Sequence, residues 1–384
     1  MGKVAAPKLG GKLRQSRIAL LFGTRPEAIK LSPVARALGE LGEPPALIVT
    51  GQHPGLELAN HKLEGFPASF LNNSGLPDPS LHADLVRSAA KRLLSSNPPQ
   101  LLIVAGGTSS ALGGALAARE VGVPFAHLDA GLRTFDPNQP WPEEENRVII
   151  DRLANILFAP TRMNAANLRR DMVPGQIHVT GSSGMDALSE IVGRLPARPR
   201  RRAPWRRFRI LVTCHRRDNW QAGLEGLAEA LGKLSSNVRT SLILPPNPTI
   251  AQRMTALLGD TREITLVPPL SHAAFIEAMR SVDLVLSDSG GVEEEAPALG
   301  VPLLVLRDKT ERPEGLANGS SELIGTSAER IVEKVDQLRR RPDQLRAMRR
   351  SSLPFGDGRS GPRIARRALL FLDELASPLQ SSIA

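Results

Sequence analysis

The sequence of 384 residues contains no tyrosine, only 3% aromatic residues and a single cysteine, Cys214. One thiol cannot form an internal disulfide, which excludes a disulfide-stapled secreted fold. No stretch approaches the ~20 apolar residues that a membrane-spanning helix needs, so no membrane span is predicted. The apolar run that follows the basic N-terminus, at 18–22, is too short for a signal-peptide core, and we therefore predict a cytoplasmic protein.

Positive charge is in excess, with 49 Lys and Arg residues against 39 Asp and Glu residues. Much of this excess lies in two arginine-rich stretches, at 194–209 and 339–350. Proteins that bind nucleic acid by base stacking place aromatic side chains beside basic ones, and aromatic residues are scarce here. We interpret the two stretches as a solvated linker and helix surface and expect no nucleic-acid partner. A weak attraction to anionic surfaces stays open.

Short apolar runs alternate with longer amphipathic segments along the chain, which is typical of parallel sheets covered by helices on both faces. The length fits two domains. The predicted fold class is α/β, with two Rossmann-like domains that face a cleft. Strands are predicted at 17–22, 45–50, 101–105, 156–160, 177–180, 210–213, 240–244, 264–267, 282–287 and 301–306, and helices, among others, at 28–41, 110–120, 221–234, 328–337 and 363–377.

The domain boundaries follow from one interruption of this alternation. A Pro- and Arg-rich stretch at 192–207 is predicted to be the interdomain linker. The remaining chain divides into a flexible N-terminus at 1–16, a Rossmann-like domain at 17–191, a second Rossmann-like domain at 208–362, and a final helix with a tail at 363–384.

Two strand-to-helix turns have the composition of anion-binding sites. In the first, at 22–27, the N–H groups of the helix start and the guanidinium of Arg25 would favour a diphosphate. In the second, Ser289, Gly290 and Gly291 would present N–H groups to a phosphate, and the carboxylates one turn later could bind a ribose diol. Each turn is equally compatible with an ordinary structural role.

Titratable residues gather near other strand ends. Asp129 and Glu143, with Arg133 and Arg147 nearby in the sequence, are residue types that acid–base catalysis uses. An acidic helix start would also account for Glu143. His215 follows a buried strand and precedes two arginines, which favours a phosphate site over a core position. We predict neither a metal nor a cofactor.

The ordered motifs resemble the non-hydrolysing UDP-N-acetylglucosamine 2-epimerases from about residue 17 to 372. The resemblance implies a glycosyltransferase-B-type architecture in which the C-terminal helix packs on the first domain and the second domain binds UDP. It also implies a UDP-sugar substrate, a homodimer and a place in polysaccharide biosynthesis. The motifs that carry it are 22–27 (FGTRPE), 51–53 (GQH), 130–134 (AGLRT), 141–147 (WPEEENR), 215–217 (HRR), 288–291 (DSGG) with 294–297 (EEAP), and 310–314 (TERPE).

The resemblance also implies a reaction, the interconversion of UDP-GlcNAc and UDP-ManNAc or a related NDP-sugar. The C2 proton leaves while UDP departs from C1, and UDP then adds back after protonation on the other face. The implied catalytic residues are Glu143, Asp129 and His215. The implied substrate-binding residues are Arg25, Arg133, Arg147, Ser289, Gly290, Gly291, Glu295, for the uridine ribose, and Arg312.

This chain departs from the family pattern at two acidic positions. Gly107 stands where the family has an aspartate, and Asp129 stands where the family has a glutamate. Restoring the carboxylate by Gly107→Asp would then be a complementary test. The departures leave two alternatives to the epimerase, namely a nucleotide-sugar hydrolase or transferase and a non-catalytic UDP-sugar-binding homologue.

Overall fold

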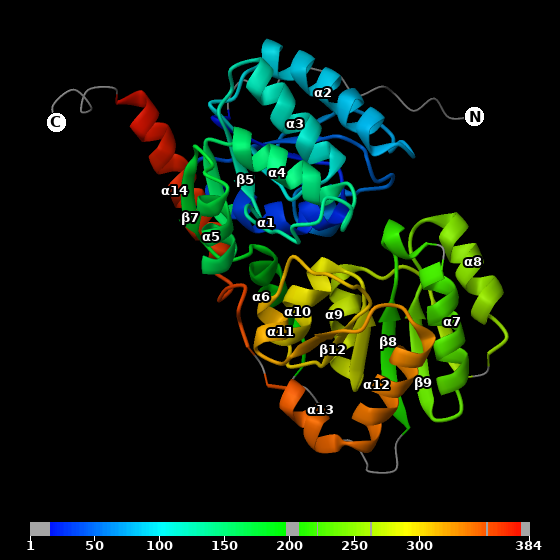
Figure 1. The fold of residues 1–384 in the computed structure, drawn as a ribbon. Helices are drawn as coiled ribbons and strands as arrows, with labels where there is room; N and C mark the ends of the chain where they lie inside the picture. The colour runs from blue at the N-terminus through cyan, green and yellow to red at the C-terminus, as the bar shows by residue number, and fades with distance from the viewer. Residues whose placement is uncertain (1–15, 197–206, 221, 262, 351, 378–384) are drawn as a thin grey trace. The chain divides into compact units, whose positions relative to one another are not determined.

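The computed structural model describes residues 16–196, 207–220, 222–261, 263–350 and 352–377 (Figure 1). Nearly all of the predicted flexible N-terminus, most of the predicted linker and the tail beyond residue 377 lie outside the described residues. Within the described ranges, no helix is long and apolar enough to cross a membrane. The chain forms two compact units. The first holds the described residues up to Leu132, Pro142–Ala187 and the chain from Gly356 on, and the second holds Arg133–Trp141 and Leu188–Phe355.

A parallel sheet of seven strands, as far as the described residues go, forms the centre of the first unit in the order β3-β2-β1-β4-β5-β6-β7. Successive side chains of a strand point to opposite faces, so Leu20 and Phe22 enter one hydrophobic cluster while Ala19 and Leu21 enter another. The strands are β1 (Ile18–Phe22), β2 (Ala46–Val49), β3 (Ala68–Phe70), β4 (Leu101–Ala105), β5 (Phe125–Leu128), β6 (Ile156–Ala159) and β7 (Gln176–Val179).

Helices bury both faces of this sheet. These helices are α1 (Arg25–Glu40), α2 (Pro79–Ser96), α3 (Ser109–Glu120), α4 (Glu143–Leu153), α5 (Arg162–Arg170) and α14 (Ser360–Ala376), with a short turn η2 (Leu58–His61). Helix α6 (Gly184–Arg194) begins in the first unit and continues into the second. Residues of α1 and α14 share the cluster that contains Phe22, while α3 supplies the opposite cluster. As predicted, the C-terminal helix packs on the first unit, where the Asp186 carboxylate accepts the N–H groups of Ser360 and Gly361 at 2.9 and 2.8 Å.

The second unit repeats the architecture with a six-stranded parallel sheet, counted over its described residues, in the order β10-β9-β8-β11-β12-β13. Its strands are β8 (Phe208–Thr213), β9 (Val238–Ile243), β10 (Ile264–Val267), β11 (Leu284–Ser287), β12 (Leu303–Val305) and β13 (Ser321–Leu323). Its helical segments are η3 (Arg217–Asn219), α7 (Ala222–Leu234), α8 (Pro248–Leu258), α9 (His272–Ser281), α10 (Gly290–Ala298), α11 (Glu314–Ala317), α12 (Ala328–Arg340) and α13 (Pro342–Met348). The predicted α/β class with two Rossmann-like sheets is thus confirmed.

The strand order decides which loops meet. In the second unit β8 and β11 are neighbours, with Thr213 paired to Ser287, so the segments that follow these two residues emerge side by side. In the first unit β4 and β5 are neighbours, with Ala105 paired to Leu128, and the segments after these residues emerge together in the same way. Loops at the carboxyl ends of parallel strands are where such sheets bind ligands.

Candidate active site

The turn that begins α1 is built around a buried glutamate. Glu27 accepts the N–H groups of Gly23 and Thr24 at 2.9 and 2.7 Å, and the Thr108 hydroxyl at 2.5 Å. Burial raises the pKa of Glu27, and these hydrogen bonds act against that shift. The Arg25 N–H lies 3.4 Å from the ring of His53. The interpretation that these three N–H groups await an anion is therefore wrong, although the Arg25 side chain is exposed.

Asp129 follows β5 directly and forms a buried ion pair with a residue that the sequence did not point to. Its carboxylate contacts the ammonium group of Lys30, one turn inside α1. The Asp129 backbone has a φ of 61°, a left-handed conformation that is uncommon outside glycine. Because 99 positions separate the two residues, no local pattern could have indicated the pair.

Glu143 is the first residue of α4 and is partly exposed, while Glu144 and Arg147 after it are buried. Arg147 contacts the Glu144 carboxylate at 2.5 Å and donates from Nε to the Leu132 carbonyl at 3.1 Å. Two of its three guanidinium nitrogens are thereby bonded within the protein. Arg133, at the start of the segment that belongs to the second unit, is also buried.

Gly107 lies against the start of α4, where no other residue would fit. A Cβ atom at this position would be 2.4 Å from the Glu143 carbonyl oxygen and 2.9 Å from Cγ of Arg147. The amide of Asn146 donates to the Gly107 carbonyl at 2.9 Å. The glycine therefore allows the turn at 106–107 to pack tightly against the start of α4. Gly107→Asp cannot restore the family's carboxylate without moving α4.

In the second unit, Asp288 organises the loop that carries His215. The fully buried carboxylate accepts the N–H groups of His215 and Arg216 at 3.0 and 2.9 Å and the Asn219 amide at 3.0 Å. Burial alone would raise the pKa of Asp288, but the nearby His215 and these hydrogen bonds bring it below the ordinary value. The His215 ring itself is 46% exposed, so the backbone is fixed and the ring remains accessible.

We expect Asp288→Asn to destabilise the fold and weaken UDP binding, because an amide cannot accept all of these donors. Unsatisfied buried donors cost roughly 1–3 kcal/mol, which urea unfolding measures. The lowered pKa means that the carboxylate stabilises the fold above the ordinary value of 3.8 and loses this effect as pH falls through its folded-state pKa. The difference in unfolding free energy between the wild type and Asp288→Asn should therefore become smaller below about pH 4.

Asp283→Asn is the matched control for this substitution. Asp283 also accepts a backbone N–H group, that of Arg209 at 3.0 Å, but it lies at the opposite end of the β8–β11 pair. We expect it to lower stability without changing the affinity for UDP measured by calorimetry. Equal UDP affinity of Asp288→Asn and the wild type would contradict the organising role of Asp288.

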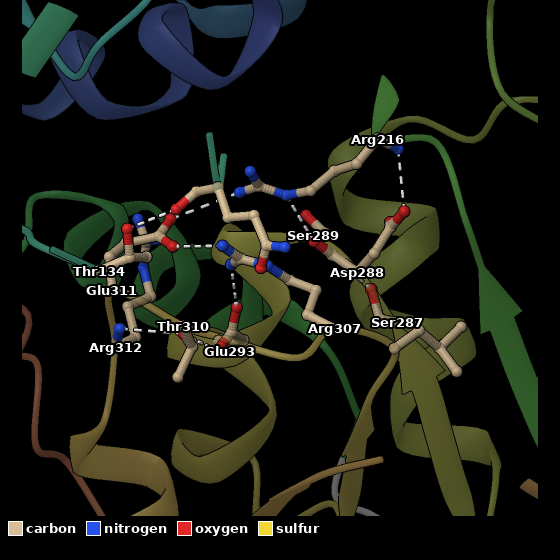
Figure 2. A network of polar contacts seen from close by, with 12 residues as sticks. Thr134, Arg216, Ser287, Asp288, Ser289, Glu293, Arg307, Thr310, Glu311 and Arg312 are labelled. Carbon is tan, nitrogen blue, oxygen red and sulfur yellow. Dashed lines mark hydrogen bonds and ion pairs between the residues drawn. The ribbon is translucent and has the colours of Figure 1, made fainter. Parts of the chain in front are cut away.

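The start of α10 is surrounded by a buried network of arginines and glutamates (Figure 2). Arg312 donates from Nε to Glu294 at 2.8 Å and contacts Glu311 at 2.5 Å through Nη1. The same Glu311 contacts Arg307 at 2.7 Å and Arg216 at 3.4 Å. A Cβ atom at Gly290 would be 2.4 Å from Nη1 of Arg312, so this guanidinium lies directly beside the first turn of the helix.

The predicted ribose-binding residue, Glu295, has a partner that the sequence analysis missed. Nε2 of His272, the first residue of α9, lies 2.6 Å from the Glu295 carboxylate. Ser289 precedes α10, and its N–H group donates to the Ser287 hydroxyl at 3.0 Å. Gly290 and Gly291 open the helix, where the first N–H groups have no acceptor within the helix.

The described residues offer neither an activated thiol nor a metal cluster. Cys214 is buried, and burial together with the neighbouring Asp288 raises the pKa of its thiol well above the ordinary range. No group of three or more His, Cys, Asp or Glu side chains within the described ranges could hold a metal ion.

The predicted site residues fall into two sets. Arg25, Asp129, Glu143 and Arg147 belong to the first unit, and Arg133, His215, Ser289–Gly291, Glu295 and Arg312 belong to the second. All of these residues lie in the segments that follow the strands, either in the connecting loop or in the first two turns of the next helix. Lys30, Asp288 and His272 join these sets through contacts between residues distant in sequence.

The chain is similar to known proteins over most of its length. A family profile described as UDP-N-acetylglucosamine 2-epimerase matches residues 42–368. The UDP-N-acetylglucosamine 2-epimerase of Escherichia coli (strain K12) is 35% identical over 367 residues, which cover 91% of this chain and 97% of that protein. The crystal structure of UDP-GlcNAc 2-epimerase from Neisseria meningitidis bound to UDP-GlcNAc has a TM-score of 0.84 at 32% identity and covers 92% of this chain and 99% of that chain. The enzyme from Methanocaldococcus jannaschii in complex with UDP-GlcNAc and UDP has a TM-score of 0.82 at 29% identity, with the same two coverages.

Proposed function

The chain belongs to the UDP-N-acetylglucosamine 2-epimerase family, and we propose that it interconverts UDP-GlcNAc and UDP-ManNAc by elimination and re-addition of UDP. The observation that carries this proposal is the match of 92% of the chain to an epimerase structure bound to UDP-GlcNAc. The retained Glu143 and the ion-paired Asp129 support it, because they supply carboxylates for proton transfer.

In the proposed reaction, a base takes the proton from C2 while the bond between C1 and the diphosphate oxygen breaks. The electron pair of the C2–H bond forms the C1–C2 double bond of 2-acetamidoglucal, and UDP leaves with the electron pair of the broken C–O bond. A proton then adds to the opposite face of C2 and UDP adds back to C1. Atoms and charge balance without an oxidant, a reductant or a metal. The reaction needs proton carriers for both faces of C2 and groups that stabilise the departing diphosphate.

We assign the proton transfers to Glu143 and Asp129, with His215 as the third catalytic residue. The contact with Lys30 supports this assignment for Asp129, because an ion pair with a neighbouring ammonium group limits the movement of the carboxylate. Glu143 is partly exposed at the end of a helix, where it can reach a ligand.

We assign diphosphate binding to Arg25, Ser289, Gly290 and Gly291, with the Arg312 guanidinium on the sugar or diphosphate side. The helix start at α10 favours anions, and Arg312 beside Gly290 adds positive charge there. Glu295 would bind the ribose diol while His272 holds its carboxylate. Arg133 and Arg147 are retained as proposed substrate-binding residues, although two of the three guanidinium nitrogens of Arg147 are bonded within the protein.

Incubation of the full chain with UDP-GlcNAc in deuterated water tests the proposal. We expect UDP-ManNAc to appear with deuterium at C2, which proton NMR detects. Release of UDP and a free sugar would indicate a hydrolase, and transfer of the sugar to an acceptor would indicate a transferase. Binding of UDP-GlcNAc without exchange of the C2 proton would indicate a non-catalytic homologue. Each of the last three outcomes would contradict the proposed epimerase activity.

Three further expectations stay predictions. The homodimer, the cytoplasmic location and the role in polysaccharide biosynthesis rest on sequence reasoning or on the family resemblance alone. The domain limits at 17–191 and 208–362 are likewise proposed as functional boundaries, beside the two compact units that the structure forms.

A further inference from the structure

A buried histidine and aspartate lie between the two acidic segments of the first unit. His127 is in the middle of β5 and Asp151 is near the end of α4, and neither side chain is exposed to solvent. Nδ1 of His127 lies 2.6 Å from Oδ1 of Asp151, and Nε2 lies 2.8 Å from the Gly106 carbonyl oxygen. The second oxygen of Asp151 accepts the Gly131 N–H group at 3.1 Å. None of these residues is among those assigned to the reaction above.

These contacts bracket Asp129. His127 precedes it by two positions and Gly131 follows it by two, and both bind the same Asp151 carboxylate. Asp129 itself lies between them with the unusual φ of 61°. The Asp151 carboxylate therefore fixes both ends of the turn on which Asp129 is presented.

The same contacts also fix Glu143. Asp151 and Glu143 share α4, about two helical turns apart. The other nitrogen of His127 holds Gly106, whose neighbour Gly107 lies against the Glu143 carbonyl. The contacts thus form a closed ring from Asp151 through His127, the turn at 106–107 and the start of α4 back to Asp151.

The hydrogen-bond pattern specifies how many protons the pair holds. A carbonyl oxygen only accepts, so Nε2 of His127 carries a hydrogen that it donates to Gly106. A separation of 2.6 Å between Nδ1 and a carboxylate oxygen requires one more proton between those two atoms. The pair is therefore neutral as a whole, and both hydrogen bonds of the imidazole depend on this arrangement.

We propose that His127 and Asp151 are positioning residues, which place Asp129 and Glu143 so that the elimination intermediate is reprotonated before it escapes. This inference rests on the proposed epimerase function. A shift of about 1 Å in a reacting group can cost ~100-fold in rate. Displacement of the two carboxylates should slow reprotonation of 2-acetamidoglucal, and more of it should leave the enzyme together with UDP.

The decisive quantity is the ratio of released 2-acetamidoglucal to UDP-ManNAc, measured by proton NMR. This ratio does not depend on how much enzyme is folded, because unfolded molecules make neither product. In His127→Gln the amide has one donor end and one acceptor end, so an acceptor must face either the Asp151 carboxylate or the Gly106 carbonyl. We expect the ratio to rise at least ~10-fold and kcat to fall ~10–100-fold, with KM nearly unchanged.

A substitution of Asp151 should reverse the effect of His127→Gln. In the single variant Asp151→Asn, the amide can accept from Gly131 and donate to Nδ1 of a neutral imidazole, so we expect a ratio of 2-acetamidoglucal to UDP-ManNAc near that of the wild type. In the double variant H127Q/D151N, the two amides can again make all three hydrogen bonds. We therefore expect the ratio to return toward the wild-type value. Should H127Q fail to fold, the double variant still decides whether a neutral amide pair replaces the native one.

Asp186→Asn is the matched control. Asp186 is another buried carboxylate that accepts two backbone N–H groups, but it anchors the start of α14. We expect it to lower stability and leave the ratio unchanged. An unchanged ratio in H127Q, or no recovery in the double variant, would overturn the positioning role. A wild-type chain that forms neither UDP-ManNAc nor 2-acetamidoglucal would instead overturn the proposed function.

Discussion

Glu143→Gln is expected to nearly abolish exchange of the C2 proton with solvent deuterium while UDP affinity stays nearly unchanged. The amide has almost the same size as the carboxylate but cannot take up a proton. General acid–base groups contribute ~100- to 10,000-fold to rate, so the loss should fall in this range. Proton NMR of UDP-GlcNAc in deuterated water measures the exchange, and calorimetry measures the binding of UDP.

Glu145→Gln provides the control on the same helix. Glu145 lies two positions further along α4, is exposed, and contributes the same charge to the acidic first turn. We expect it to exchange the C2 proton at the wild-type rate, since loss of a helix-start charge alone should change little. Exchange that persists in Glu143→Gln would remove Glu143 from the mechanism.

Gly107→Asp, the substitution that restores the family residue, is expected to damage the enzyme. Its Cβ atom would lie 2.4 Å from the Glu143 carbonyl oxygen, so the start of α4 would have to move. Overpacking of this kind costs typically ~1–3 kcal/mol of stability. A ~1 Å displacement of Glu143 would lower kcat by about 100-fold. Urea unfolding and initial rates of UDP-ManNAc formation measure the two effects.

Gly107→Ala separates the steric effect from the charge. It introduces the same Cβ atom without a carboxylate, and we expect it to reproduce most of the loss. Gly193→Ala is a neutral reference, because a Cβ atom there meets nothing within 4 Å. A kcat for Gly107→Asp above that of the wild type would show that α4 yields easily and that the missing carboxylate limits this chain.

The sequence predicted the fold well where a strand is an uninterrupted apolar run. The run at 101–105 became β4, and the run at 282–287 contains β11. Three strands were missed, β3, β5 and β13, which are short or carry polar residues. In β5 the polar residue is His127, and its burial is possible only because Asp151 and Gly106 bind both ring nitrogens. A polar residue satisfied by a partner far along the chain gives no local signal.

In the candidate site, too, the sequence indicated positions but not the partners that are distant along the chain. Motifs placed Asp129, His215 and Ser289 at strand ends because the carboxyl ends of parallel strands meet at one edge of a sheet. The partners that orient these groups could not be predicted, since Lys30 approaches Asp129 across 99 positions and Asp288 approaches His215 across 73. The tight packing of Gly107 against α4 could not be predicted either, because it depends on where the backbone of α4 runs in the folded protein.

The fate of the oxygen that joins the sugar to the diphosphate tests the account most directly. UDP-GlcNAc would be prepared with an isotopic label in the oxygen between C1 and the β-phosphorus, and the unreacted substrate would be recovered after partial conversion. If UDP leaves and returns, the bound β-phosphate can rotate, and the label should spread to its non-bridging positions at a rate comparable to that of C2 exchange. Deuterium uptake at C2 with the label still confined to the bridging position would contradict elimination and re-addition of UDP.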